Sequence, residues 1–205
     1  MTEWLAFVLL TAVVLLVVVL LFGFTGCSLI VGGSDEDFEE AFTALFDKDR
    51  ALPNRTIVVR IGANELLNSG TKVRIFLQQA GDLQLTIYNL YISKPEDPGD
   101  PDNYNAAGDL TAVVVQEEGL NVAGQTEVDV DYSLDADLPL LIAFETRAQS
   151  ARLPFSNEPS RDLKVFLSPP PGQPPVPVHE ASLAIRSVGY ISESRNYLVS
   201  KIEVA

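Results

Sequence analysis

The sequence predicts an all-β protein, an antiparallel β-sandwich of jelly-roll type, preceded by an apolar N-terminal helix and one short amphipathic helix. Apolar and polar residues alternate over several stretches after residue 56, as expected for strands with one buried face. These stretches are short and separated by turn residues, which is typical of a sandwich. The chain begins instead with a long apolar run, for which a helix is the expected structure.

The apolar run covers residues 4–24 and contains no charged residue. It is long enough to span a bilayer, so we expect the membrane to be its partner. Two interpretations stay open: a retained signal-anchor helix, or a lipoprotein signal, because residues 24–27 (Phe-Thr-Gly-Cys) are similar to a bacterial lipobox. In the second case Cys27, the only cysteine, would be lipidated. Residues 1–33 are thus predicted to tether a domain that lies outside the cytoplasm.

A short helix is predicted between Asp35 and Asp49. Ser34 and Asp37 have the spacing of a capping box. Four apolar residues follow at spacings that place them on one helical face: Phe38, Phe42, Leu45 and Phe46. Residues 34–50 would then link the tether to a sandwich domain formed by residues 51–205.

About nine strands are predicted, among them 57–61, 73–77, 83–87, 128–134, 139–144, 163–167, 181–190 and 197–204. Residues 139–144 (PLLIAF) are apolar without alternation, which indicates a strand covered on both faces. Two long connections separate the strands, an acidic one at 95–109 and a proline-rich one at 168–179. The second connection favours extended polyproline structure.

Composition excludes several classes of function. The chain has 28 acidic and 14 basic residues, for a net charge of −14, which disfavours nucleic acid as a partner. One cysteine and one histidine cannot form a zinc cluster. No Gly-x-Ser-x-Gly motif is present, and His179, the only histidine, follows the proline run. The sequence therefore predicts a protein that is not an enzyme.

The acidic connection is the strongest candidate for chemistry. Calcium prefers oxygen ligands supplied by such turns. The predicted ligands are Asp97, Asp100, Asp102, Asn103, Asn105 and Asp109, with Glu96 beside them. Tyr104, in the same loop, is the predicted ligand-binding aromatic residue. The alternative is a solvated acidic turn, because Pro-Gly-Asp-Pro is good turn chemistry. No cofactor is required, and calcium is the one candidate.

The order of strands and turns resembles a known module. The segments that carry the resemblance are 83–92, 97–105, 110–113, 120–125, 134–144 and the closing 197–204. Together they look like the jelly-roll module that precedes some GDSL/SGNH-type esterases and that occurs at the tips of phage-like tail proteins. This resemblance implies a binding or structural module rather than the enzyme itself.

These observations predict a membrane-tethered, extracytoplasmic β-sandwich that binds a protein or a surface glycan. One alternative is a structural subunit of a surface filament or envelope assembly, a homo-oligomer whose apolar N-terminus packs in a core. A second alternative is a weak hydrolase that uses His179.

Overall fold

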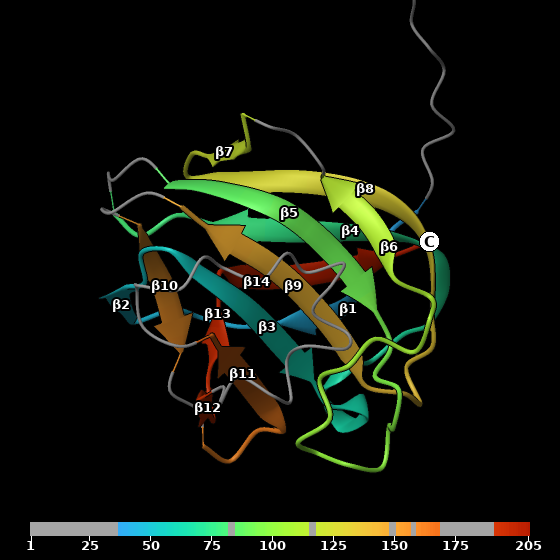
Figure 1. The fold of residues 1–205 in the computed structure, drawn as a ribbon. Coiled ribbons are helices and arrows are strands. Elements are labelled where there is room, and N and C mark those ends of the chain that lie inside the picture. The colour runs from blue at the N-terminus through green and yellow to red at the C-terminus, as the bar shows by residue number, and fades with distance from the viewer. Residues whose placement is uncertain (1–36, 82–84, 115–117, 148–150, 157–158, 169–190) are drawn as a thin grey trace, which may run out of the picture. The chain divides into compact units, whose positions relative to one another are not determined.

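The computed structural model describes residues 37–81, 85–114, 118–147, 151–156, 159–168 and 191–205. One compact unit spans Phe38–Ala205. Its strands are β1 (Glu39–Thr43), β2 (Lys48–Ala51), β3 (Arg55–Ile61), β4 (Gly70–Gln78), β5 (Leu85–Ser93), β6 (Thr111–Val114), β7 (Leu120–Val122), β8 (Gln125–Leu134), β9 (Leu140–Thr146), β10 (Arg152–Ser156), β11 (Leu163–Leu167), β12 (Ile191–Glu193), β13 (Asn196–Tyr197) and β14 (Val199–Val204) (Figure 1). A 3-10 turn, η1 (Ala63–Glu65), follows β3.

The described strands pair only antiparallel, so the predicted all-β antiparallel class is confirmed. One sheet has four strands in the order β1-β14-β4-β8. A seven-stranded sheet runs β12-β11-β3-β9-β5-β6, with β7 beside β5. A small third sheet has the order β13-β10-β2. The first and last of the described strands, β1 and β14, pair with each other.

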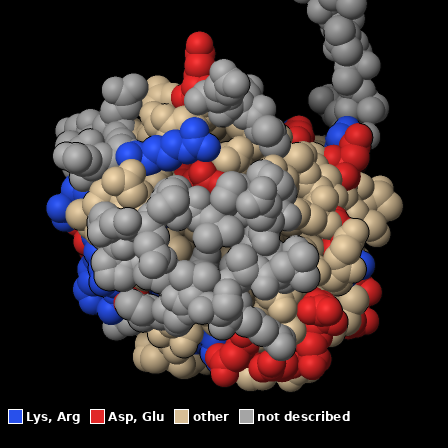
Figure 2. Space-filling view, viewed as in Figure 1, with Lys and Arg blue, Asp and Glu red and all other residues tan. Residues whose placement is uncertain are grey.

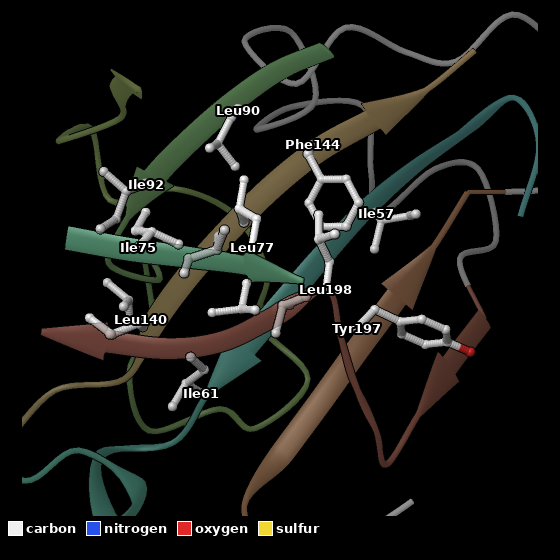
Figure 3. Close-up of a cluster of buried hydrophobic side chains, with 14 of the residues drawn as sticks. Ile57, Ile61, Ile75, Leu77, Leu90, Ile92, Leu140, Phe144, Tyr197 and Leu198 are labelled. Atoms are coloured by element: carbon white, nitrogen blue, oxygen red, sulfur yellow. The ribbon is translucent and has the colours of Figure 1, made fainter. Parts of the chain in front are cut away.

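The main core lies between the two large sheets and makes the fold sandwich-like. Alternate residues of β4, such as Ile75 and Leu77, are fully buried against residues of β5 and β9, including Leu90 and Phe144. Figure 3 shows these side chains converging from both sheets. Period-two alternation supplies each sheet with one apolar face, and burying both faces together removes them from water.

A second, smaller core explains the continuous apolar run of residues 139–144. All seven residues of β9 are buried. Leu140, Ile142 and Phe144 face the main core, whereas Leu141 and Ala143 belong to a separate cluster on the other face. Tyr104 and Leu110, from the connection between β5 and β6, pack against that cluster. β9, within the seven-stranded sheet, is therefore covered on both faces.

The predicted amphipathic helix at 35–49 is wrong, because β1 and β2 occupy this segment. The four apolar residues do not share a face. Phe42 is fully buried, Leu45 is 84% exposed, and the ring of Phe38 lies under the guanidinium of Arg74 at 4.0 Å. A bulge in β1 lets both Ala41 and Phe42 point inward. Strand β14, near the opposite end of the chain, supplies β1 with main-chain hydrogen bonds. This long-range pairing stabilises the strand more than the local sequence pattern stabilises a helix.

Several predicted features lie outside the described residues. These are the apolar run at 4–24, Cys27, the proline-rich connection from residue 169 onward, His179 and the strand at 181–190. Within the described ranges, no helix has the length and apolarity needed to cross a membrane.

Candidate functional site

The connection between β5 and β6, residues 94–110, forms a closed substructure that we call the acidic loop. Pro95 and Ala106 form an antiparallel bridge at its base. Beside the bridge, the Glu96 N–H donates to the Asn105 carbonyl at 2.7 Å, and the Ala107 N–H donates to the Lys94 carbonyl at 2.9 Å. The two ends of the loop are thus held together by main-chain hydrogen bonds.

Three predicted calcium ligands support turns within the acidic loop. Asp97 Oδ1 accepts from the Gly99 N–H at 3.1 Å, and Asp100 Oδ1 accepts from the Asp102 N–H at 2.9 Å. The amide oxygen of Asn103, a buried residue, accepts in the same way from the Asn105 N–H at 3.1 Å. Asp and Asn favour such turns because their side-chain oxygen accepts from the N–H two residues later, in place of a main-chain carbonyl.

Asp109 anchors the acidic loop to the sheets. Its Oδ1 accepts from the Ser93 hydroxyl at 2.6 Å and from the Lys94 N–H at 3.1 Å. Its Oδ2 accepts from the Tyr132 hydroxyl of β8 at 2.8 Å. Burial, the bond to Asp109 and the negative charge of that carboxylate together raise the pKa of Tyr132 far above its ordinary value. Tyr132 therefore remains a donor throughout the physiological range.

Contacts with the outer face of the seven-stranded sheet dock the tip of the acidic loop. Lys164 of β11 pairs with Asp102, with Nζ 2.8 Å from Oδ1. Arg60 of β3 donates from Nη2 to the Pro98 carbonyl at 3.2 Å. The rings of Tyr104 and Phe166 lie 4.4 Å apart. Arg60 and Lys164 are register partners on neighbouring strands, so β3 and β11 present two adjacent cations to the loop.

The predicted calcium ligands all lie in one loop, but their carboxylates do not point toward a common site. In the part of the chain that the structure describes, no three Asp, Glu, His or Cys side chains are grouped as a metal site would require. Asp109 is committed to three donors at the base, and Asp102 to Lys164 at the tip. Calcium binding by the loop stays a prediction. Tyr104 is half-buried against the sheet rather than fully exposed.

A cavity of about 570 Å³ lies beside the acidic loop. Five segments line it: the end of β3, η1, the tip of the acidic loop, the turn before β9 and the residue before β11. The lining residues are Arg60, Ala63, Asn64, Pro98, Gly99, Pro101, Asp137, Pro139 and Asp162. It is a shallow hollow that is open to solvent over most of its surface.

Arg60 is the unusual residue of this cavity. It is only 3% exposed, and its Nε and Nη1 atoms make no hydrogen bond within the described part of the chain. The nearest carboxylate belongs to Asp162, whose Oδ1 lies 3.7 Å from Nη1, which is beyond hydrogen-bond distance. A buried donor without an acceptor costs about 1–3 kcal/mol, and more when charged, so the burial of these two nitrogen atoms needs an explanation.

Sequence reasoning missed Arg60, although a signal was present. The strand sequence Arg-Thr-Ile-Val-Val-Arg-Ile carries a cation at its apolar end, inside an otherwise buried strand. A charged residue is almost never fully buried unless it is paired or functional. The other lining residues lie far apart in the sequence, and only the fold brings them together.

Charge is unevenly distributed over the described surface. Figure 2 shows acidic side chains gathered at the lower right, where Figure 1 places the tip of the acidic loop, whereas Lys and Arg gather at the left edge. The exposed acids of the loop include Glu96, Asp97 and Asp102. The lining of the cavity itself contains two acidic residues, Asp137 and Asp162, and one basic residue, Arg60.

Comparison of the sequence with protein-family models and with curated proteins found no match. The likeness to the accessory module of esterases and tail-tip proteins therefore stays a prediction from the order of strands and turns.

Proposed function

We propose that this protein is a membrane-tethered, extracytoplasmic binding module, built on a jelly-roll-like sandwich and without catalytic activity, whose ligand is a protein or a glycan at the cell surface. The tether is the apolar run at residues 4–24, whether retained as a helix or replaced by lipid on Cys27. The observation that carries the proposal is the cavity beside the acidic loop, with the buried cation Arg60 in its wall.

The construction of this cavity supports binding. Its polar groups stand on a rigid scaffold, because Arg60 belongs to a strand at the centre of a sheet and the acidic loop is docked by several contacts. Three of its lining residues are prolines, which lose little conformational entropy when a ligand binds. Loops held on a rigid β framework are common places for recognition.

Retention of envelope components tests the proposal. The full chain, solubilised in detergent and immobilised, is exposed to two fractions of the envelope of its own cell, one freed of protein by protease and one freed of glycan by glycosidases. We expect one fraction to be retained. Replacing the exposed cavity residue Asn64 with Trp should weaken retention, because the ring would obstruct part of the cavity. Failure to retain either fraction would refute the binding function.

The mass of the protein extracted from membranes tests the tether. A mass equal to residues 27–205 plus lipid would establish a lipoprotein, and an unprocessed mass would establish a retained helix. A protein that partitions with the soluble fraction, unprocessed, would refute membrane tethering.

A further inference from the structure

Cations concentrate at the exposed edge of the small sheet. All four residues of the edge strand β2 are exposed, and two of them are Lys48 and Arg50. Arg152 lies on the neighbouring strand β10, and Arg195 shares the carboxylate of Glu193 with Arg50. We call Lys48, Arg50, Arg152 and Arg195 the basic edge. Figure 2 shows Lys and Arg gathered at the left, where Figure 1 places β2 and β10.

The charge of the basic edge differs from that of the chain as a whole. Among the described residues, its four cations form ion pairs with three carboxylates, those of Asp47, Asp49 and Glu193. The whole chain instead has 28 acidic and 14 basic residues. The Debye length at physiological salt is about 8 Å, so a surface that approaches this edge responds to the local charges more than to the net charge. An anionic surface therefore meets attraction at the basic edge.

The ion pairs of the basic edge leave its cations able to bind phosphate. The side chains of Lys48, Arg50 and Arg152 are between 42% and 54% exposed. Exposed ion pairs contribute little to stability, so these cations can exchange a carboxylate for another anion at small cost. Arg152 donates to Asp49 from Nε and Nη2, and a guanidinium has five N–H donors in total. Two of these donors can bind one phosphate group together.

An exposed leucine lies next to the basic edge. Leu45, in the turn between β1 and β2, is 84% exposed, which is the highest value for a large apolar side chain in the described ranges. Phe46 follows it and lines a hollow together with Lys48 and Pro154. An apolar side chain flanked by cations suits the interface of a bilayer, because the apolar group enters the acyl region while the cations stay at the headgroups.

The predicted tether is long enough to bring this edge to a bilayer. Residues 25–37 separate the apolar run from Phe38, and 13 residues span at most about 45 Å. Leu45 lies seven residues after Phe38, which is at most about 25 Å along the chain. A tether also keeps the effective concentration of lipid high at the domain, so even a weak contact becomes populated.

From these observations we infer that the domain lies on an anionic bilayer through its basic edge, with Leu45 inserted among the lipids and Lys48, Arg50 and Arg152 on headgroup phosphates. This inference rests on the proposed membrane tether and adds a second, oriented contact to it. Figure 2 shows the acidic side chains at the lower right, apart from the basic edge, so this orientation holds the acidic loop off the membrane.

Tryptophan fluorescence in lipid nanodiscs tests the contact. Trp4 is the only tryptophan, so Trp4→Phe provides a background in which Leu45→Trp introduces a single probe. The full chain is inserted in discs made of equal parts of phosphatidylglycerol and phosphatidylcholine, with or without bromine on the phosphatidylcholine acyl chains. We expect bromine to quench the emission of Leu45→Trp by roughly half or more, because the inserted ring meets the acyl chains. Ala112→Trp, at an exposed position of β6, is the control probe and should keep its emission.

Charge variants test the role of the cations. Each cation at an anionic surface strengthens the contact about fivefold. Lys48→Gln, Arg50→Gln and Arg152→Gln together should therefore lower the ratio of bound to free domain about a hundredfold and remove the quenching. The matched control changes the net charge equally on the outer face of the four-stranded sheet, with the three substitutions Lys72→Gln, Arg74→Gln and Lys201→Gln, and should leave the quenching unchanged. Circular dichroism establishes that each variant is folded.

Each other result overturns the inference in a defined way. Unquenched emission from position 45, in a chain that co-elutes with the discs, would refute the contact and leave the tether intact. A chain that does not enter the discs would refute the tether itself. Equal quenching in discs of phosphatidylcholine alone, or equal loss in the two triple variants, would show that the basic edge does not recognise anionic headgroups. Equal quenching at positions 45 and 112 would show that the domain has no fixed orientation on the bilayer.

Discussion

The hydrogen bond between Tyr132 and Asp109 should hold the acidic loop to the sheets, and Tyr132→Phe tests this by removing one oxygen atom. Tyr132 is 5% exposed, and its hydroxyl lies 2.8 Å from Asp109 Oδ2. Hydrogen bonds to charged groups contribute about 1.5–3 kcal/mol. Asp109 keeps its bonds to Ser93 and Lys94, so we expect a cost near the lower end, about 1.5–2 kcal/mol.

Thermal unfolding followed by circular dichroism measures this cost. In a domain of this size 1 kcal/mol shifts Tm by about 2–4 °C, so Tyr132→Phe should lower Tm by roughly 3–8 °C. Amide exchange should also accelerate across residues 95–109, because that loop loses its anchor to β8. Combined with Asp109→Asn, the substitution should cost less than the sum of the single changes.

Tyr91→Phe is the matched control. Tyr91 is also buried, at 8% exposure, but its hydroxyl forms no hydrogen bond with another described residue. Its removal should change stability by no more than about 0.5 kcal/mol. Equal losses in Tyr132→Phe and Tyr91→Phe, or additive costs in the double variant, would show that the bond to Asp109 does not anchor the loop.

Two further predictions concern the sheets. Gly119→Ala should destabilise the fold by about 1–3 kcal/mol in a urea titration, because Gly119 has φ +73° and a Cβ would lie 2.8 Å from the Ile87 carbonyl oxygen. Gly124→Ala is the control: Gly124 has φ +61° with open space around it, so this substitution should cost less in the same titration. Asp129→Asn should cost at most about 1 kcal/mol at pH 7, since its pair with Arg74 is exposed, and it leaves Arg74 in place over the ring of Phe38. The hydrogen bond from Arg74 lowers the pKa of Asp129 below its ordinary 3.8, so this difference should be complete above pH 3.8 and disappear as pH falls below it; a difference that persists in full at pH 2 would contradict the assignment.

Period-two alternation predicted the central strands because it is a local consequence of burying one face. Residues 128–134 alternate strictly and lie in β8, and residues 73–77 lie in β4. The segment at 35–49 was predicted wrongly for the opposite reason. Its capping signals and apolar spacing are local, whereas the pairing that decides its structure joins β1 to β14, at the far end of the chain.

The candidate site was predictable only in its turn chemistry. Asp97, Asp100 and Asn103 belong to the Asp- and Asn-rich turns that the sequence indicates, and the structure uses them as turn acceptors. The docking of the loop could not be predicted, because it depends on the register that places Arg60 beside Lys164. The pattern of residues within a single strand does not specify which residue of another strand will lie opposite.

The outer faces of the two large sheets differ, and the difference explains where the cavity lies. On the four-stranded sheet, the exposed residues Glu127, Asp129 and Asp131 of the edge strand β8 lie opposite Phe76, Arg74 and Lys72 of β4. This row of like charges favours solvation and repels a further strand at the edge. The outer face of the seven-stranded sheet is apolar around Phe166 and is covered by the acidic loop. Covering a face with a loop leaves a seam where the loop, the sheet and η1 meet, and the cavity with Arg60 in its wall lies at that seam. Arg60 is a buried cation at this seam, where it donates to the Pro98 carbonyl and pairs with Asp162, and the cost of burying it supports the proposal that the cavity has a role beyond folding.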